Sequence, residues 1–129
     1  MLKIFCIITG GGIGAISRYG LFLLVQRLTG PQFPSGTLAV NLLGSLLTGF
    51  LWSLLMETHI SPEWRLFIFT GLLGGFTTFS TFTLESTQLV EAGKWDIAVI
   101  YMAASNIIGL LLVFLGYFLA QKFLLLQAR

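Results

Sequence analysis

Four long apolar segments dominate this chain of 129 residues. They cover residues 2–28, 36–56, 66–90 and 97–120, and the second and fourth contain no charged residue. A helix needs about 20 apolar residues to cross the hydrocarbon core of a bilayer, whereas a strand of a membrane β-barrel needs about ten residues that alternate in polarity. The segments therefore predict an all-α membrane protein with four transmembrane helices in a single domain, 1–129.

The composition agrees with this fold class. Hydrophobic residues make up 56% of the chain and charged residues only 9%, whereas about a quarter of the residues in a soluble domain are charged. The connections between the segments are short, so we expect any functional site to be built from the helices and their tight turns. We identify no pairing of a nucleophile with a base and no cluster of metal-ligating side chains, and we predict that the chain is not an enzyme.

The distribution of basic residues does not favour one orientation of the chain in the membrane. An even number of spans puts both termini on one side of the membrane. That side carries Lys3, Arg65, Lys122 and Arg129, whereas the other carries Arg27 and Lys94, together with Arg18 if its side chain extends that way. Because the positive-inside rule acts through a difference between the two sides, this near balance predicts insertion in both orientations.

Four helices enclose little space, so a permeation path is more easily built between two copies of the chain. Small residues recur at helix-packing spacing, which permits close contacts either between copies or within one chain. The pairs are Gly10 and Gly14, Gly71 and Gly75, Ser45 and Gly49, and Ser105 and Gly109. We favour a homodimer over a monomer on the size of the bundle alone.

The third segment has the most unusual polar sequence. Gly74 and Gly75 are followed by a run that mixes hydroxyl and phenyl side chains, Phe76-Thr77-Thr78-Phe79-Ser80-Thr81-Phe82-Thr83. Glycine pairs followed by dense hydroxyls form poor continuous helix, which predicts a third helix broken in mid-membrane. A break leaves backbone carbonyls and amides that lipid cannot satisfy, and free carbonyls suit a cation such as Na⁺.

Beyond this break, Thr77, Ser80 and Thr81 share one helix face, and Phe79 and Phe82 share another. The edge of a phenyl ring is electropositive, so paired rings can line an anion path without a full charge. The alternative is that the hydroxyls bond to their own helix and the rings face lipid. The combination of break, hydroxyl row and phenyl pair favours the anion path.

Three further polar residues leave alternatives open. Asn41, in the uncharged second segment, can bond to a neighbouring helix or donate to an anion. The Arg18 side chain can reach the headgroups or face the bundle and attract anions to a vestibule. Glu85 lies near the end of the third segment, where we expect it to reach water.

The sequences Gly36-Thr37-Leu38 through Asn41 and Gly44, and Gly74-Gly75-Phe76-Thr77-Thr78-Phe79-Ser80-Thr81-Phe82, closely resemble those of the Fluc (CrcB) fluoride channels of bacteria. The sequence from Gly14-Ala15 to Arg18-Tyr19 is similar to their first helix. The resemblance implies a fluoride-selective channel of the bacterial inner (plasma) membrane that confers fluoride resistance by passive export. It also implies an antiparallel, dual-topology homodimer with a structural Na⁺ ion at its interface, and no nucleic-acid partner.

The resemblance further implies roles for individual residues. The fluoride pathway would be lined by Asn41, Phe79, Phe82, Ser80, Thr81, Tyr101 and Ser105, with Arg18 and Glu85 near vestibules. The backbone carbonyls of Gly74 and Thr77 would hold Na⁺. Gly109 stands where some relatives carry a second serine, so of that hydroxyl pair on the fourth helix this chain carries only Ser105.

Two other classes of protein compete with this reading. A small multidrug-type proton-coupled exporter also has four short spans, but its mechanism needs a carboxylate deep within an early helix, and the first segment has none. A structural assembly factor without transport activity is the third class, and measurement of ion flux in liposomes separates the three.

Overall fold

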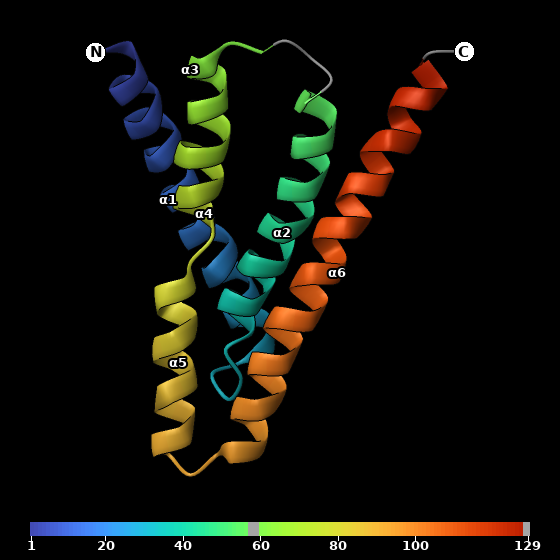
Figure 1. Cartoon of the computed structure of the whole chain (residues 1–129). Coiled ribbons are helices and arrows are strands. Elements are labelled where there is room, and N and C mark those ends of the chain that lie inside the picture. The colour runs from blue at the N-terminus through green and yellow to red at the C-terminus, as the bar shows by residue number, and fades with distance from the viewer. Residues whose placement is uncertain (57–59, 128–129) are drawn as a thin grey trace.

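The computed structural model describes residues 1–56 and 60–127, and the secondary structure of these residues is helical throughout (Figure 1). Four helical stretches are long and apolar enough to cross a membrane: Leu2–Thr29, Ser35–Leu55, Pro62–Glu91 and Trp95–Gln127. The predicted all-α chain with four helices of transmembrane length is therefore confirmed.

The first, second and fourth stretches are the single helices α1 (Leu2–Thr29), α2 (Ser35–Met56) and α6 (Trp95–Gln127). The third is divided into α3 (Pro62–Arg65), the π-helix η1 (Leu66–Leu73), α4 (Gly74–Phe76) and α5 (Phe79–Glu91). It begins four residues before the apolar run, where the Ser61 hydroxyl caps the helix and Pro62 occupies its first turn. Helix α6 likewise continues past the apolar run 97–120 to Gln127.

The start of α1 and the end of α6 lie at the same end of the bundle, as Figure 1 shows, and α3 lies there too. Helix α6 packs mainly along α2, whereas α1 packs against η1 and α4. The start of α1, α3 and the end of α6 therefore lie at one end of the bundle, and the end of α1 and the start of α6 lie at the other, in agreement with the two groups of basic residues assigned from the sequence. Arg129, assigned to the first group from the sequence, lies outside the described residues.

Glycines permit the closest helix contacts within the chain. A Cβ atom at Gly10 would lie 2.5 Å from the Phe67 carbonyl oxygen, and one at Gly75 would lie 2.6 Å from the Gly11 carbonyl oxygen. On the other side of the bundle, a Cβ at Gly49 would collide with the carbonyl of Val113 on α6. These glycines bring α1 onto the third stretch and α2 onto α6, so their spacing is explained by packing inside one chain.

Two residues interrupt the third helical stretch. Thr77 has φ −81° and ψ 156°, and Thr78 has φ −147° and ψ 113°, so both are extended between α4 and α5. Helix α5 begins again at Phe79, where the Thr78 hydroxyl caps it by accepting a hydrogen bond from the Thr81 amide. The polar residues of the interruption therefore lie between helices, at the centre of the candidate site.

Candidate functional site at the helix interruption

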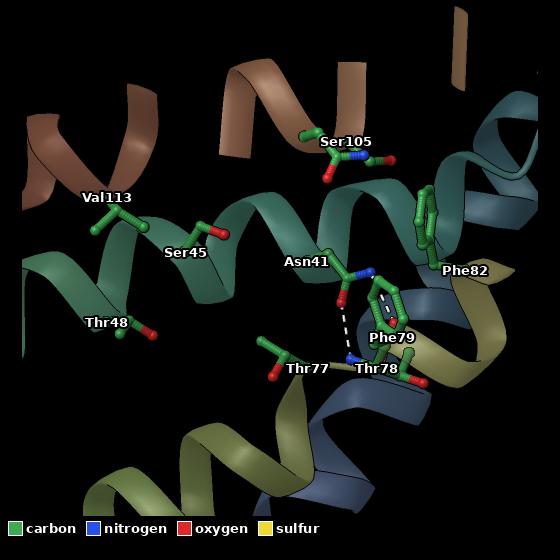
Figure 2. A pocket seen from close by; sticks show the side chains of 10 residues that line it. Asn41, Ser45, Thr48, Thr77, Thr78, Phe79, Phe82, Ser105 and Val113 are labelled. Carbon is green, nitrogen blue, oxygen red and sulfur yellow. Dashed lines mark hydrogen bonds between the residues drawn. The ribbon is translucent and has the colours of Figure 1, made fainter. Parts of the chain in front are cut away.

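The Asn41 side chain pairs with the backbone of Thr78 across the space between α2 and the interruption. The Thr78 amide donates to Asn41 Oδ1 at 2.8 Å, and Asn41 Nδ2 donates to the Thr78 carbonyl at 3.0 Å (Figure 2). Both backbone groups of this buried residue are thus satisfied by one side chain. An amide nitrogen carries two hydrogens, so Asn41 keeps one donor beyond this pair.

The interruption also redirects two amides that a continuous helix would use. In an α-helix, the amides of Thr78 and Thr81 would donate to the carbonyls of Gly74 and Thr77. Here they donate to the Asn41 side chain and to Thr78 Oγ1, at 2.8 and 3.2 Å. The carbonyls of Gly74 and Thr77 therefore lose their normal helical donors.

A cavity of about 330 Å³ opens beside this pairing. Its lining comes from α2, from the interruption and α5, and from α6 (Figure 2). Seven of the ten described residues that line it carry a hydroxyl or amide group, and none is charged; they are Asn41, Ser45, Thr48, Thr77, Thr78, Phe79, Phe82, Ser105, Asn106 and Val113. Such a surface offers neutral hydrogen-bond donors to an ion and no fixed charge to hold it permanently.

Two phenyl rings border the cavity. The rings of Phe79 and Phe82 are 5.7 Å apart, and Phe82 lies 5.3 Å from the ring of Tyr101. Phe82 is 8% exposed, whereas Phe79 is 74% exposed. The fully buried Tyr101 packs against Phe82 but does not line the cavity.

Ser80 and Thr81 do not line this cavity. Ser80 is exposed, with its hydroxyl 3.5 Å from that of Thr78, whereas Thr81 Oγ1 accepts a hydrogen bond from Thr78 Oγ1 at 2.9 Å. Thr81 instead lines a second cavity, of about 210 Å³, together with Arg18 and Thr37. Thr78 borders both cavities, so a chain of hydroxyls connects the Asn41 cavity with the one that contains Arg18.

Glu85 is half-buried and accepts two hydrogen bonds. Thr37 Oγ1 donates to Oε1 at 2.8 Å, and the Tyr101 hydroxyl donates to Oε2 at 2.7 Å. Glu85 also borders a third cavity, of about 350 Å³, beside Gln26 and the exposed Lys94. The carboxylate thus faces an opening, and it is also held by hydrogen bonds from two neighbouring helices.

The sequence profile of the family described as "CrcB-like protein, Camphor Resistance (CrcB)" matches residues 5–117. The chain belongs to this CrcB family. A relative from Parabacteroides distasonis is 45% identical over 95% of each chain, and one from Desulfotalea psychrophila is 42% identical over 97% of each. A Thermus thermophilus relative is 47% identical over 84% of this chain and 86% of its own.

Each of these three CrcB relatives is named "Fluoride-specific ion channel FluC". The resemblance drawn from the sequence is therefore confirmed at the level of the family. The family consists of channels and not of enzymes, and the comparisons give no support to the multidrug-type exporter.

In this CrcB chain, the structure brings Asn41, Phe79, Phe82 and Ser105 together around one cavity. Ser105 Oγ is buried and has no hydrogen-bond partner among the described residues. Thr37 was not assigned a role from the sequence, although it bonds to Glu85. The apolar sequence around Thr37 gives no indication that its hydroxyl bonds to a residue 48 positions away.

Proposed function

We propose that this protein is a fluoride channel that lets fluoride pass down its gradient across the bacterial inner membrane and so protects the cell by export. The observation that carries the proposal is a cavity lined by uncharged residues, most of which carry a hydroxyl or amide group. Relatives that match the chain over nearly its whole length are named fluoride channels, which supports it. Passive conduction needs neither coupling to an energy source nor a catalytic group.

The chemistry of the cavity suits fluoride. Fluoride is small and strongly hydrated, so it loses water only where donors replace that water at short range. The spare Asn41 N–H and the unpartnered Ser105 hydroxyl are such donors. The edges of Phe79 and Phe82 add weak positive potential, so the ion is stabilised without a charged residue that would trap it.

The route continues from this cavity over the hydroxyls of Thr78, Ser80 and Thr81 towards the cavity that contains Arg18. Arg18 is half-buried there, and its positive charge raises the local concentration of anions. Glu85 borders another cavity, where α5 meets the loop before α2, and it accepts a hydrogen bond from the buried Tyr101. Arg18 and Glu85 therefore act at vestibules, and the neutral donors act between them.

The decisive experiment is ion efflux from liposomes that contain the purified protein. A fluoride electrode should record rapid efflux, and a chloride electrode should record little. Equal fluoride efflux from empty and protein-containing liposomes would refute the proposal, and efflux that requires a proton gradient would favour an exporter.

We further propose that two copies assemble as an antiparallel homodimer with dual topology. The near balance of basic residues between the two ends supports insertion both ways up. Phe79, a cavity residue, leaves 74% of its surface uncovered in one chain, and a second copy would cover it. Reporters fused to the C-terminus should give signals from both sides of the membrane in comparable amounts, whereas a one-sided signal would exclude the antiparallel arrangement.

A structural Na⁺ ion at the dimer interface is the third part of the proposal. Gly74 and Thr77 would hold it through their carbonyls, which fit a hard cation because both have lost their helical donors. The interruption at Thr77 and Thr78 would then lie in mid-membrane, where lipid leaves such carbonyls no other partner. Thermal unfolding should occur at a higher temperature in Na⁺ than in a large organic cation. Equal melting temperatures would count against the ion.

A further inference from the structure

Five hydroxyl side chains line the cavity beside Asn41. Apart from Thr78, which caps α5, they fall into two groups. Serine and threonine in membrane helices commonly donate back to a carbonyl one turn earlier. Thr48 does so to Gly44 at 2.7 Å, and Thr77 does so to Leu73 at 2.9 Å. No hydrogen bond between described residues involves the Ser45 hydroxyl, and Ser105 Oγ is buried without a partner. Ser45 and Ser105 therefore each keep an O–H group that the fold does not use.

These two serines line the same cavity from two facing helices (Figure 2). Ser45 lies on α2, and its Oγ is 3.5 Å from the position that a Cβ atom at Gly109 of α6 would occupy. Ser105 and Gly109 are four residues apart on α6 and so share a face. The absence of a side chain at Gly109 thus leaves open the space beside the Ser45 hydroxyl, one turn along α6 from Ser105.

We propose that Ser45 and Ser105 form a second anion subsite, in which one hydroxyl from α2 and one from α6 hydrogen-bond the same fluoride ion. This inference rests on the proposed channel function and adds a residue, Ser45, to the pathway. Asn41 and Ser45 are one turn apart on α2, so the subsite lies next to the Asn41 donor. Successive weak sites at this spacing let an ion move on without an intermediate that binds too tightly.

Ser45→Ala and Ser105→Ala test the subsite in liposomes. Loss of one donor to a charged acceptor weakens binding about tenfold, so each change should lower fluoride efflux and raise the fluoride concentration that half-saturates it by about that factor. The double variant should lose much less than the product of the two effects, because both hydroxyls bind one ion. Thr9→Val is the matched control: its hydroxyl donates to Phe5 within α1 at 2.8 Å, outside the cavity, and its efflux should equal that of the parent.

Gly109→Ala tests the same subsite without removal of a hydroxyl. The new methyl would lie 3.5 Å from Ser45 Oγ and 4.0 Å from Leu42 Cδ2, which are ordinary contacts, so the protein should assemble as the parent does. The methyl would cover the Ser45 hydroxyl and reduce efflux as Ser45→Ala does.

The outcomes separate the two proposals. A parent protein that passes no fluoride refutes the channel function, and the subsite with it. A conducting parent whose Ser45→Ala variant assembles and conducts equally refutes the subsite alone. The subsite is also refuted if Thr9→Val loses as much fluoride efflux as Ser45→Ala does.

Discussion

Asn41→Leu removes a side chain that satisfies two backbone groups and replaces it with one of similar size that can neither donate nor accept. The Thr78 amide and carbonyl, bonded to Asn41 at 2.8 and 3.0 Å, would both lose their partner. Thr78 is only 9% exposed, so water has little access to either group. Because each buried polar group left unpaired costs about 1–3 kcal/mol, we expect the free energy of unfolding to fall by about 2–6 kcal/mol.

Asn41→Asp adds a charge at the same place. An aspartate keeps an oxygen that can accept from the Thr78 amide, but its second oxygen would face the Thr78 carbonyl with no hydrogen between them. Because a buried carboxylate without a partner costs more than a lost hydrogen bond, Asn41→Asp should destabilise the fold at least as much as Asn41→Leu. The negative charge would also repel anions in the cavity, so fluoride efflux should be abolished in the variant even where it assembles.

Denaturant unfolding of the purified protein in detergent micelles measures these differences. Asn106→Leu is the matched control, because this exposed amide donates only to Met102 within α6, at 2.7 Å. It should change the free energy of unfolding by no more than about 0.5 kcal/mol. If Asn41→Leu unfolded at the same denaturant concentration as Asn106→Leu, the Thr78 backbone would have other partners and the reasoning would be wrong.

Three other substitutions have clear expected outcomes. Phe79→Ile should abolish fluoride efflux while the fold of each chain survives, because Phe79 is largely exposed within one chain, whereas Phe82→Ile should also destabilise the buried ring cluster. Parental efflux in both variants would exclude a ring-lined path. Gly49→Ala should lower the free energy of unfolding by about 1–3 kcal/mol, because the new methyl forces α2 and α6 apart. Gly12→Ala is its control and should leave that free energy unchanged, because the space around Gly12 is open. Equal free energies of unfolding in the two variants would contradict the close contact of α2 with α6 at Gly49. Glu85→Gln should lower the free energy of unfolding by about 1.5 kcal/mol, because the amide has one oxygen in place of the two that accept from Thr37 and Tyr101. An unchanged free energy of unfolding would show that these two hydrogen bonds contribute little.

The helices could be predicted from the sequence because lipid leaves an apolar segment of this length almost no other regular structure. Their ends were less predictable. Helix α6 continues to Gln127, past the end of the apolar run, because nothing in Gln121 or Lys122 stops a helix. The third stretch begins at Pro62 because a serine cap and a proline favour a helix start even outside the apolar run.

The site was predictable in its residue types but not in its pairings. The sequence indicates that Asn41, Phe79 and Phe82 are unusual, and the structure places all three around one cavity. It could not indicate that Asn41 pairs with Thr78, or that Glu85 accepts from Thr37, because those partners are 37 and 48 positions apart in the chain. Contacts at such separations are set by how helices cross, and close helix crossing here depends on glycines that carry no polar signal.

The interruption at Thr77 and Thr78 has a consequence for both kinds of ion. An anion needs spare donors, and a cation needs spare acceptors. Pairing with Thr78 leaves Asn41 one spare N–H, whereas the amides diverted from Gly74 and Thr77 leave two carbonyls without their helical donors. One two-residue break thus leaves a neutral donor that suits the proposed fluoride pathway and neutral acceptors that suit the proposed Na⁺ site. In the proposed channel, groups of this kind take the place of charged side chains, whose burial among apolar helices is costly.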